Sequence, residues 1–179
     1  MPTTTVNVNT IAGDTTSFNV NAATILSRAS DGDTGTTFIN GTVNVSLTFG
    51  LQDLVDLDGL PAGATLNSIR PVVFAQTGGK GTANFSMEIL NEDGEVQGDS
   101  SDASSSEAEP AEFLGSEVNI SSFTSDQFNG LLLRYTTLDN TLVVASRIFA
   151  TLDYSSAAGN GLIKLTSGFL KLRQGKITL

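Results

Sequence analysis

The chain has 179 residues and a net charge of −10, and only 39% of its residues are apolar and 16% charged. It contains no Cys, His or Trp, which excludes Cys- or His-based metal sites, cysteine nucleophiles and any Ser-His-Asp triad. The acidic balance argues against nucleic acid as a partner, because phosphate binding needs clustered cations. We therefore expect no cofactor and no enzyme activity.

The N-terminal segment lacks the features of a secretion signal. Residues 1–5 include neither a basic n-region nor an apolar stretch. No run in the sequence has the length of a membrane span. These features predict a protein made in a cytoplasm, with no membrane as partner.

Short runs rich in Thr, Val, Ile and Phe occupy the first 40 residues and favour extended structure. They predict strands over residues 3–9, 17–20, 24–29 and 36–39. Gly and Asp in 31–35 predict a turn between the last two runs.

The next part of the chain contains alternating patterns typical of strands with one buried and one exposed face. Such strands are predicted over residues 43–49 and 83–90, and a long strand over 65–76. Pro71 lies inside the long strand and predicts a sheet edge or a bulge, because proline has no N–H to donate. Residues 51–60 could form one helical turn or an irregular edge, and a loop is favoured.

Beyond residue 91 the sequence predicts a hairpin turn over 92–95 and then a low-complexity stretch. Residues 97–112 are rich in Ser, Glu and Asp and are predicted to form a long exposed loop, because no apolar pattern holds them to a core. One helical turn over 125–130 and strands over 131–135 and 141–154 follow. Eight to ten strands predict an all-β, antiparallel β-sandwich or jelly roll over residues 1–156.

The segment over residues 157–179 has a different character. Gly recurs every seven residues, at 161, 168 and 175, and an apolar residue follows each Gly after two and after four positions. The apolar residues of this repeat and its neighbour are Ile163, Leu165, Phe169, Leu170, Leu172, Ile177 and Leu179. The segment contains fewer than three full units, which are too few to bury their own apolar faces. We predict an extended C-terminal β-arm that symmetry mates or a neighbouring protein complete; two ordinary strands packed on the chain's own sandwich are the alternative.

The charge of this arm also differs from that of the body. The first 160 residues carry −14, whereas the remaining residues carry +4 and no acid. The cations of the arm are Lys164, Lys171, Arg173 and Lys176. A basic arm on an acidic body predicts attachment to an acidic neighbour, such as a second copy of the body.

Two groups of carboxylates are the candidates for site chemistry. Asp31 and Asp33 have the spacing that begins a calcium loop, but position twelve of such a loop would be Thr42 rather than Glu. A plain turn is the alternative. The second group comprises Asp53, Asp56 and Asp58. It would suit glycoside hydrolysis only if two of these acids face each other across a cleft. Solvated loop acids are the alternative for this group.

Several stretches of the chain together resemble a jelly-roll domain of tailed-bacteriophage virion proteins. They are TILSRASDGD (24–33), TFI (37–39), LPAGATLNSIRPVV (60–73), FTSDQFNGLLLRY (123–135) and IFATLDY (148–154). Within that group the chain is most similar to capsid decoration, or cement, proteins. The resemblance implies a structural protein without catalytic residues that binds the outer capsid surface and bridges and stabilises capsomers.

The same resemblance implies partners and a location. The partner would be the major capsid protein or another virion protein, the chain would form a homo-oligomer with a trimer favoured, and it would be assembled in a host cytoplasm onto the capsid surface. Two alternatives stay open: a tail-fibre or other virion component that recognises host glycans, and a carbohydrate-binding module. Saccharide binding would favour the alternatives over decoration.

Overall fold

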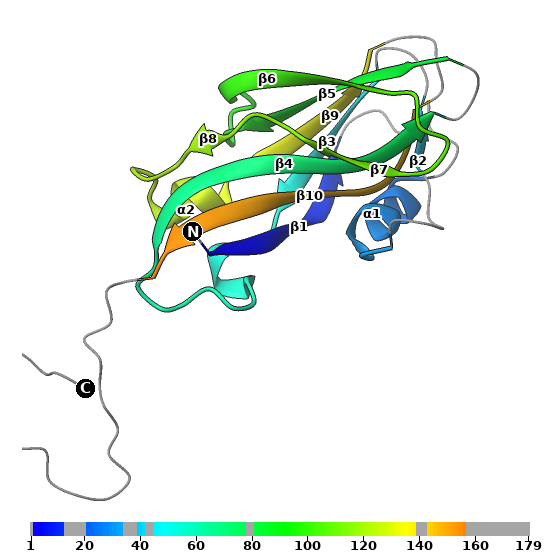
Figure 1. Ribbon diagram of the computed structural model, residues 1–179. Coiled ribbons are helices and arrows are strands. Elements are labelled where there is room, and N and C mark those ends of the chain that lie inside the picture. Colours follow the sequence, from blue (N-terminus) through cyan, green and yellow to red (C-terminus); the bar gives the residue numbers. More distant parts are fainter. Residues whose placement is uncertain are drawn as a thin grey trace, which may run out of the picture.

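The structure is a computed structural model, and it describes residues 2–12, 21–33, 39–41, 45–77, 81–138 and 143–156. These residues form an antiparallel β-sandwich of the jelly-roll class, as the alternating patterns predict (Figure 1). The predicted strands over 17–20 and most of 36–39, and the whole arm over 157–179, lie outside the described residues.

Two sheets make up the sandwich. The first, called the β10 sheet, contains β1 (Thr3–Ala12), β2 (Ile39–Gly41), β4 (Thr65–Thr77), β7 (Ala111–Leu114), β8 (Val118–Asn119) and β10 (Val143–Ser155). The second, called the β9 sheet, contains part of β1 with β3 (Ser46–Leu51), β5 (Ala83–Leu90), β6 (Val96–Ser105) and β9 (Leu132–Thr137). The helices are α1 (Ala22–Ser30), α2 (Ser125–Asn129) and the single 3-10 turn η1 (Leu54–Asp56).

Strand β1 joins the two sheets. Its first half pairs with β10, and its second half pairs with β3 after an irregularity in register between Val8 and Thr10. Gly50 of β3 faces this irregularity, where an added Cβ would come within 2.2 Å of the Thr10 Oγ1 atom. The crossing therefore depends on a residue without a side chain at this point.

The core lies between the inner faces of the two sheets. Phe85 and Met87 of β5 are fully buried, as their alternation predicts, and so are Ile148 and Leu152 of β10. The Tyr135 ring of β9 packs against Phe85 with centroids 5.6 Å apart. Residues between these core positions on each strand face outward, which fixes what the outer surface presents.

The prediction of a strand over 24–29 is wrong, because these residues belong to helix α1. The Asn21 side chain accepts a hydrogen bond from the Thr24 N–H at 3.0 Å and caps the helix. Ile25 and Ala29, one helical turn apart, are both fully buried. The cap and the i, i+4 apolar pair favour a helix over a strand here.

The prediction of a long loop over 97–112 is also wrong. Most of it forms β6, which pairs with β5, and the start of β7, which pairs with β4. The backbone ladder to β5 holds β6 in place, so its Ser and Asp side chains are free to face solvent. An apolar pattern is therefore absent although the strand is present.

Pro71 lies in the interior of β4, where it pairs with Ala150 of β10. On its other side, β7 pairs from Val72 onward and β8 ends at Ile69, so Pro71 falls between these two partners. The Gly115 N–H donates to the Pro71 carbonyl at 2.8 Å across this gap. The position needs no N–H from residue 71, which is why proline is tolerated.

The predicted turns are confirmed. The Asp33 N–H donates to Asp31 Oδ1 at 2.8 Å, and the Gly94 N–H donates to the Asn91 carbonyl at 3.0 Å in the β5–β6 hairpin. Helix α2 begins at a capping box in which Thr124 and Gln127 exchange side-chain-to-backbone hydrogen bonds. In the part of the chain that the structure describes, no helix is long and apolar enough to cross a membrane.

Candidate ligand-binding site on the outer face of the β10 sheet

A depression with a volume of about 240 Å³ lies on the outer face of the β10 sheet. Its polar lining comes from neighbouring strands at aligned register positions, with Asp153 beside both Thr3 and Ser68. We call it the sheet-face depression, and its lining residues are Thr3, Ser68, Arg70, Leu114, Glu117, Thr151 and Asp153. Because Ile69 and Leu152 turn into the core, their neighbours on each strand face outward into this depression.

An ion pair forms the centre of the sheet-face depression. The Arg70 Nη2 atom lies 2.8 Å from the Glu117 Oε2 atom, and the two side chains are 37% and 47% exposed. The pKa of Glu117 is held below its ordinary value of 4.5, first by a hydrogen bond from the Ser68 hydroxyl and also by the Arg70 charge, which together outweigh desolvation. The carboxylate is therefore ionised at neutral pH and paired with Arg70.

The sheet-face depression offers hydrogen-bond donors and acceptors at short range. The Glu117 carboxylate accepts, the Arg70 guanidinium donates, and the threonine hydroxyls do both. Leu114, whose side chain is 55% exposed, adds an apolar contact at the rim. This set of groups suits binding of a polar ligand, since its glutamate is ionised and positioned to accept hydrogen bonds rather than to donate a proton.

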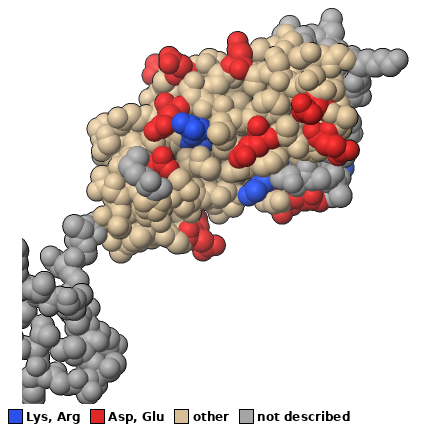
Figure 2. Space-filling model, viewed as in Figure 1, with Lys and Arg blue, Asp and Glu red and all other residues tan. Residues whose placement is uncertain are grey.

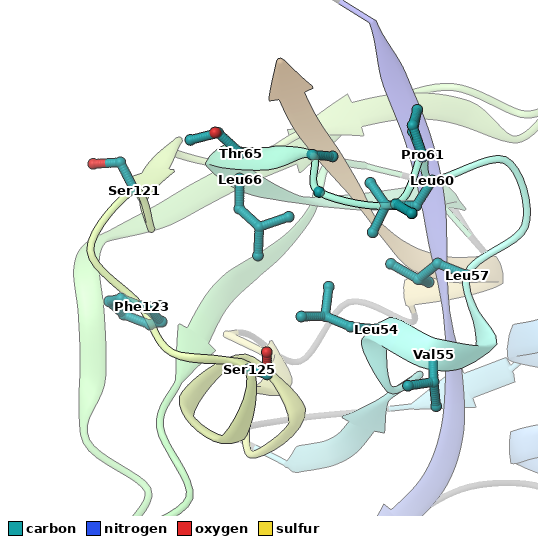
Figure 3. A pocket seen from close by; sticks show the side chains of 13 residues that line it. Leu54, Val55, Leu57, Leu60, Pro61, Thr65, Leu66, Ser121, Phe123 and Ser125 are labelled. Atoms are coloured by element: carbon teal, nitrogen blue, oxygen red, sulfur yellow. The ribbon is translucent and has the colours of Figure 1, made fainter. Parts of the chain in front are cut away.

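A second hollow, of about 720 Å³, lies at the end of the sandwich where β10 stops and β4 begins. We call it the end groove, and it is lined by Leu54, Val55, Leu57, Leu60, Pro61, Ala62, Gly63, Ala64, Thr65, Leu66, Ser121, Phe123 and Ser125. Figure 3 shows Leu54 and Leu66 pointing toward one another across this space, with Phe123 on the far side. The end groove is thus mainly apolar, in contrast to the sheet-face depression.

The loop over 52–64 forms one wall of the end groove and is tied to its surroundings by backbone contacts. The Leu54 N–H donates to Asn129 Oδ1 of α2 at 2.9 Å. The Tyr154 hydroxyl of β10 donates to the Gly59 carbonyl at 3.3 Å. Helix α2, capped by Thr124, forms part of the opposite wall.

The two groups of carboxylates singled out in the sequence lie in different parts of the described structure. Asp31 and Asp33 form a turn, and no cluster of three or more metal-ligating side chains occurs among the described residues. The group over 53–58 lies on the loop of the end groove, with Asp56 and Asp58 exposed. The arm residues, from Ile163 to Leu179, lie outside the described part of the chain.

Sequence reasoning missed the sheet-face depression. Arg70 and Glu117 are 47 positions apart, and the strand pairing of β4 with β8 brings them together. No local motif marks either residue. The one usable signal is alternation: Ser68 and Arg70 fall on the polar side of a strand that is otherwise apolar.

Figure 2 shows the face of the molecule that carries β4, β10 and β1 in Figure 1. Acidic side chains are spread over this face, and basic side chains are few. Two ion pairs occur between described residues, Arg70–Glu117 in the sheet-face depression and Arg134–Glu88 between β9 and β5. Among the charged side chains on this face, the acidic ones therefore predominate.

No protein-family model matches the sequence, and a search of curated proteins finds no match. Among solved structures, the chain is similar to a truncated AlyQ with CBM32 and alginate lyase domains, at 11% identity and a TM-score of 0.49. That match covers 88% of this chain, which spans only 35% of the AlyQ chain.

Two further similar structures are carbohydrate-binding modules in complex with ligands. One is the CBM32 of AlyQ with 4,5-unsaturated mannuronic acid, at 9% identity and a TM-score of 0.44, covering 83% of this chain and 97% of that one. The other is TmCBM61 with beta-1,4-galactotriose, at 16% identity and a TM-score of 0.37, covering 81% and 87%. These saccharides are ligands of those proteins.

Proposed function

We propose that this chain is a non-catalytic binding module that holds a saccharide in the sheet-face depression. The observation that carries the proposal is the Arg70–Glu117 pair, at 2.8 Å, which joins β4 to the connection between β7 and β8 and is open to solvent. Ser68, only 6% exposed, supports the carboxylate from beneath.

A sugar fits these groups because its hydroxyls can donate to the Glu117 carboxylate and accept from the Arg70 guanidinium. Hydrogen bonds to charged groups contribute about 1.5–3 kcal/mol each, more than those between neutral groups. The exposed Leu114 side chain gives the C–H face of a sugar ring an apolar contact. A few placed polar groups beside apolar surface are the usual lining of a small-ligand site.

The charges of the sheet-face depression favour a neutral saccharide over an acidic one. Arg70 is already paired with Glu117, and Asp153 adds a further negative charge. A uronate or phosphate would meet this carboxylate without a free cation to offset it. We therefore expect neutral oligosaccharides to bind more tightly than uronic acids.

The test is a glycan array followed by calorimetric titration of the full chain. Neutral oligosaccharides, with beta-1,4-galactotriose among the probes, are compared with 4,5-unsaturated mannuronic acid. Glu117→Gln removes the charged acceptor and is expected to weaken binding about tenfold or more, by the value of a charged hydrogen bond.

Glu112→Gln is the matched control. Glu112 is an exposed acid on β7, on the same face of the sheet but outside the sheet-face depression. The control is expected to bind as the unmodified chain does. Equal affinities for both variants, or silence across the array, would contradict the proposal.

Capsid decoration, with a capsid partner, a trimer and a place on the virion surface, stays a prediction. It depends on the sequence resemblance and on the arm over 157–179. The described residues offer no observation that favours decoration over saccharide binding. A receptor-binding virion component would share the saccharide site, so the array separates decoration from both alternatives.

A further inference from the structure

The end groove leaves apolar side chains uncovered. Val55 is 87% exposed, while Leu54, Leu60, Leu66 and Phe123 are half-buried around the same space. A hollow of about 720 Å³ lined in this way suits an extended apolar segment better than a polar ligand. Its occupant must supply apolar side chains at regular spacing.

The sequence over 161–179 has such spacing. Each Gly is followed by apolar residues at two and four positions, which share one face of an extended chain. Leu170 and Leu172 of the second unit are an example. Each unit therefore offers one pair of apolar side chains on a single face, and because the repeat is seven residues long, successive pairs fall on opposite faces of an extended chain.

Charge complements this match of apolar surfaces. Exposed acids adjoin lining residues of the end groove in sequence and form what we call its acidic rim: Asp56 and Asp58 flank Leu57, and Asp126 follows Ser125. An adjoining hollow that shares Phe123 is lined by Glu92 and Asp93. Neither of the two ion pairs between described residues uses any of these carboxylates. The segment over 161–179 carries four cations and no acid, so its attraction to this rim is strong at low salt.

The point where the chain leaves β10 favours the chain's own segment as the occupant. Ser155 pairs with Thr65, which itself lines the end groove, and Asn67 Nδ2 donates to Ser155 Oγ at 2.9 Å. Figure 1 shows the end of β10 at the same end of the sandwich as α2 and the loop after β3. The four residues 157–160 reach about 13 Å when extended, at about 3.3 Å per residue, so they can bridge from this rim.

We propose that the end groove binds residues 161–179 of the same chain, with the apolar residues against the leucines and Phe123 and the cations against the acidic rim. A tether that begins at the rim gives the segment a high local concentration, which a second copy would match only at high protein concentration. The sequence predicted completion by symmetry mates or a neighbouring protein, with packing on the chain's own sandwich as the alternative; the position of Ser155 favours the same chain.

The absence of Cys from the sequence gives a direct test in the full chain. Val55→Cys places a single thiol at the end groove, on a side chain exposed enough to be replaced without loss of folding. A nitroxide spin label on this thiol is expected to remove most of the amide signal intensity of residues 161–179 in ¹H–¹⁵N spectra. Raising the salt concentration is expected to restore part of that intensity.

Glu107→Cys is the matched control. Glu107 is exposed and lies at the other end of β4, where its carbonyl accepts from the Thr77 N–H. A label there is expected to leave the signals of 161–179 unchanged. Signals of 161–179 that stay sharp with the label at position 55 would overturn the proposal.

A mixed sample separates one chain from two. Protein of natural isotope abundance that carries the spin label at Val55→Cys is mixed with ¹⁵N-labelled protein that carries no spin label. Docking within one chain predicts full signal intensity for residues 161–179 in this sample. Loss of intensity there would assign the groove to the segment of a second copy and overturn the same-chain proposal.

Discussion

The sheet-face depression and the end groove belong to one β-sandwich, but different forces hold their side chains in place. The depression lies on strands whose register fixes Ser68 and Arg70 opposite Asp153 and Thr151. The end groove is built from the loop over 52–64 and the short helix α2, joined by the single contact from Leu54 N–H to Asn129 Oδ1 and by side-chain packing. Strands suit a site that must keep polar atoms in exact positions, whereas a loop wall suits apolar contacts that tolerate small shifts.

The two regions are expected to differ most in how much the free energy of unfolding falls when an apolar residue is replaced by alanine. Phe128→Ala removes the fully buried ring of α2 and is expected to lower the free energy of unfolding by about 3–5 kcal/mol. Leu114→Ala, at the exposed rim of the sheet-face depression, is expected to change it by no more than about 0.5 kcal/mol. Urea unfolding measures the change in both variants. Similar losses of unfolding free energy in the two variants would contradict the difference between the two regions.

The core shared by both regions offers a stabilising change. The Tyr135 hydroxyl is buried and has no hydrogen-bond partner among the described residues, and burial raises the pKa of Tyr135 far above its ordinary value. Tyr135→Phe is expected to raise the free energy of unfolding by about 1 kcal/mol, because an unsatisfied buried polar group costs about 1–3 kcal/mol. Saccharide binding is expected to stay the same. A less stable variant would mean that the hydroxyl has a partner.

The wall of the end groove depends on the cap of α2. Thr124→Ala removes the hydrogen bond from the Gln127 N–H to Thr124 Oγ1, at 3.2 Å, and is expected to cost about 1 kcal/mol in urea unfolding. Ser125→Ala, at the next and exposed position, is the control and is expected to cost little. Equal effects would show that the capping box does not hold this wall.

The smallest effect concerns pH and belongs to the sheet-face depression. Because the folded-state pKa of Glu117 lies below its ordinary value of 4.5, its stabilising contribution is complete above pH 4.5 and is lost as pH falls through the folded-state pKa. As the pH is lowered from neutral, the free energy of unfolding is expected to fall slightly less for Glu117→Gln than for the unmodified chain. Solvent exposure of the Arg70–Glu117 pair keeps this difference small. Superimposable pH profiles would contradict the role given to Ser68 and Arg70.

Much of the fold was predictable, and the reasons differ from element to element. Alternation located β3 and β5 because their core positions carry Leu47 and Phe49, and Phe85 and Met87, respectively. Paired Gly and Asp located the turns. Helix α1 was missed because its β-branched residues mask a cap at Asn21. Strand β6 was missed because backbone pairing with β5, rather than side-chain burial, defines it.

The candidate sites were less predictable than the fold. The loop carboxylates drew attention because they are close in sequence, yet they surround an apolar hollow. Arg70 and Glu117 are distant in sequence and meet only through the pairing of β4 and β8. Residues that meet across a sheet have no characteristic spacing in the sequence. The apolar repeat over 161–179 can be recognised because its residues are close together in the sequence.

The most direct measurement of the central proposal is a ¹H–¹⁵N titration of the full chain with a neutral oligosaccharide that scores on the array. We predict saturable amide shifts at Ser68, Arg70, Glu117 and Thr151, and none at Leu57 or Leu66 of the end groove. Shifts confined to the end groove, or no saturable shift at the sheet-face depression, would contradict the account.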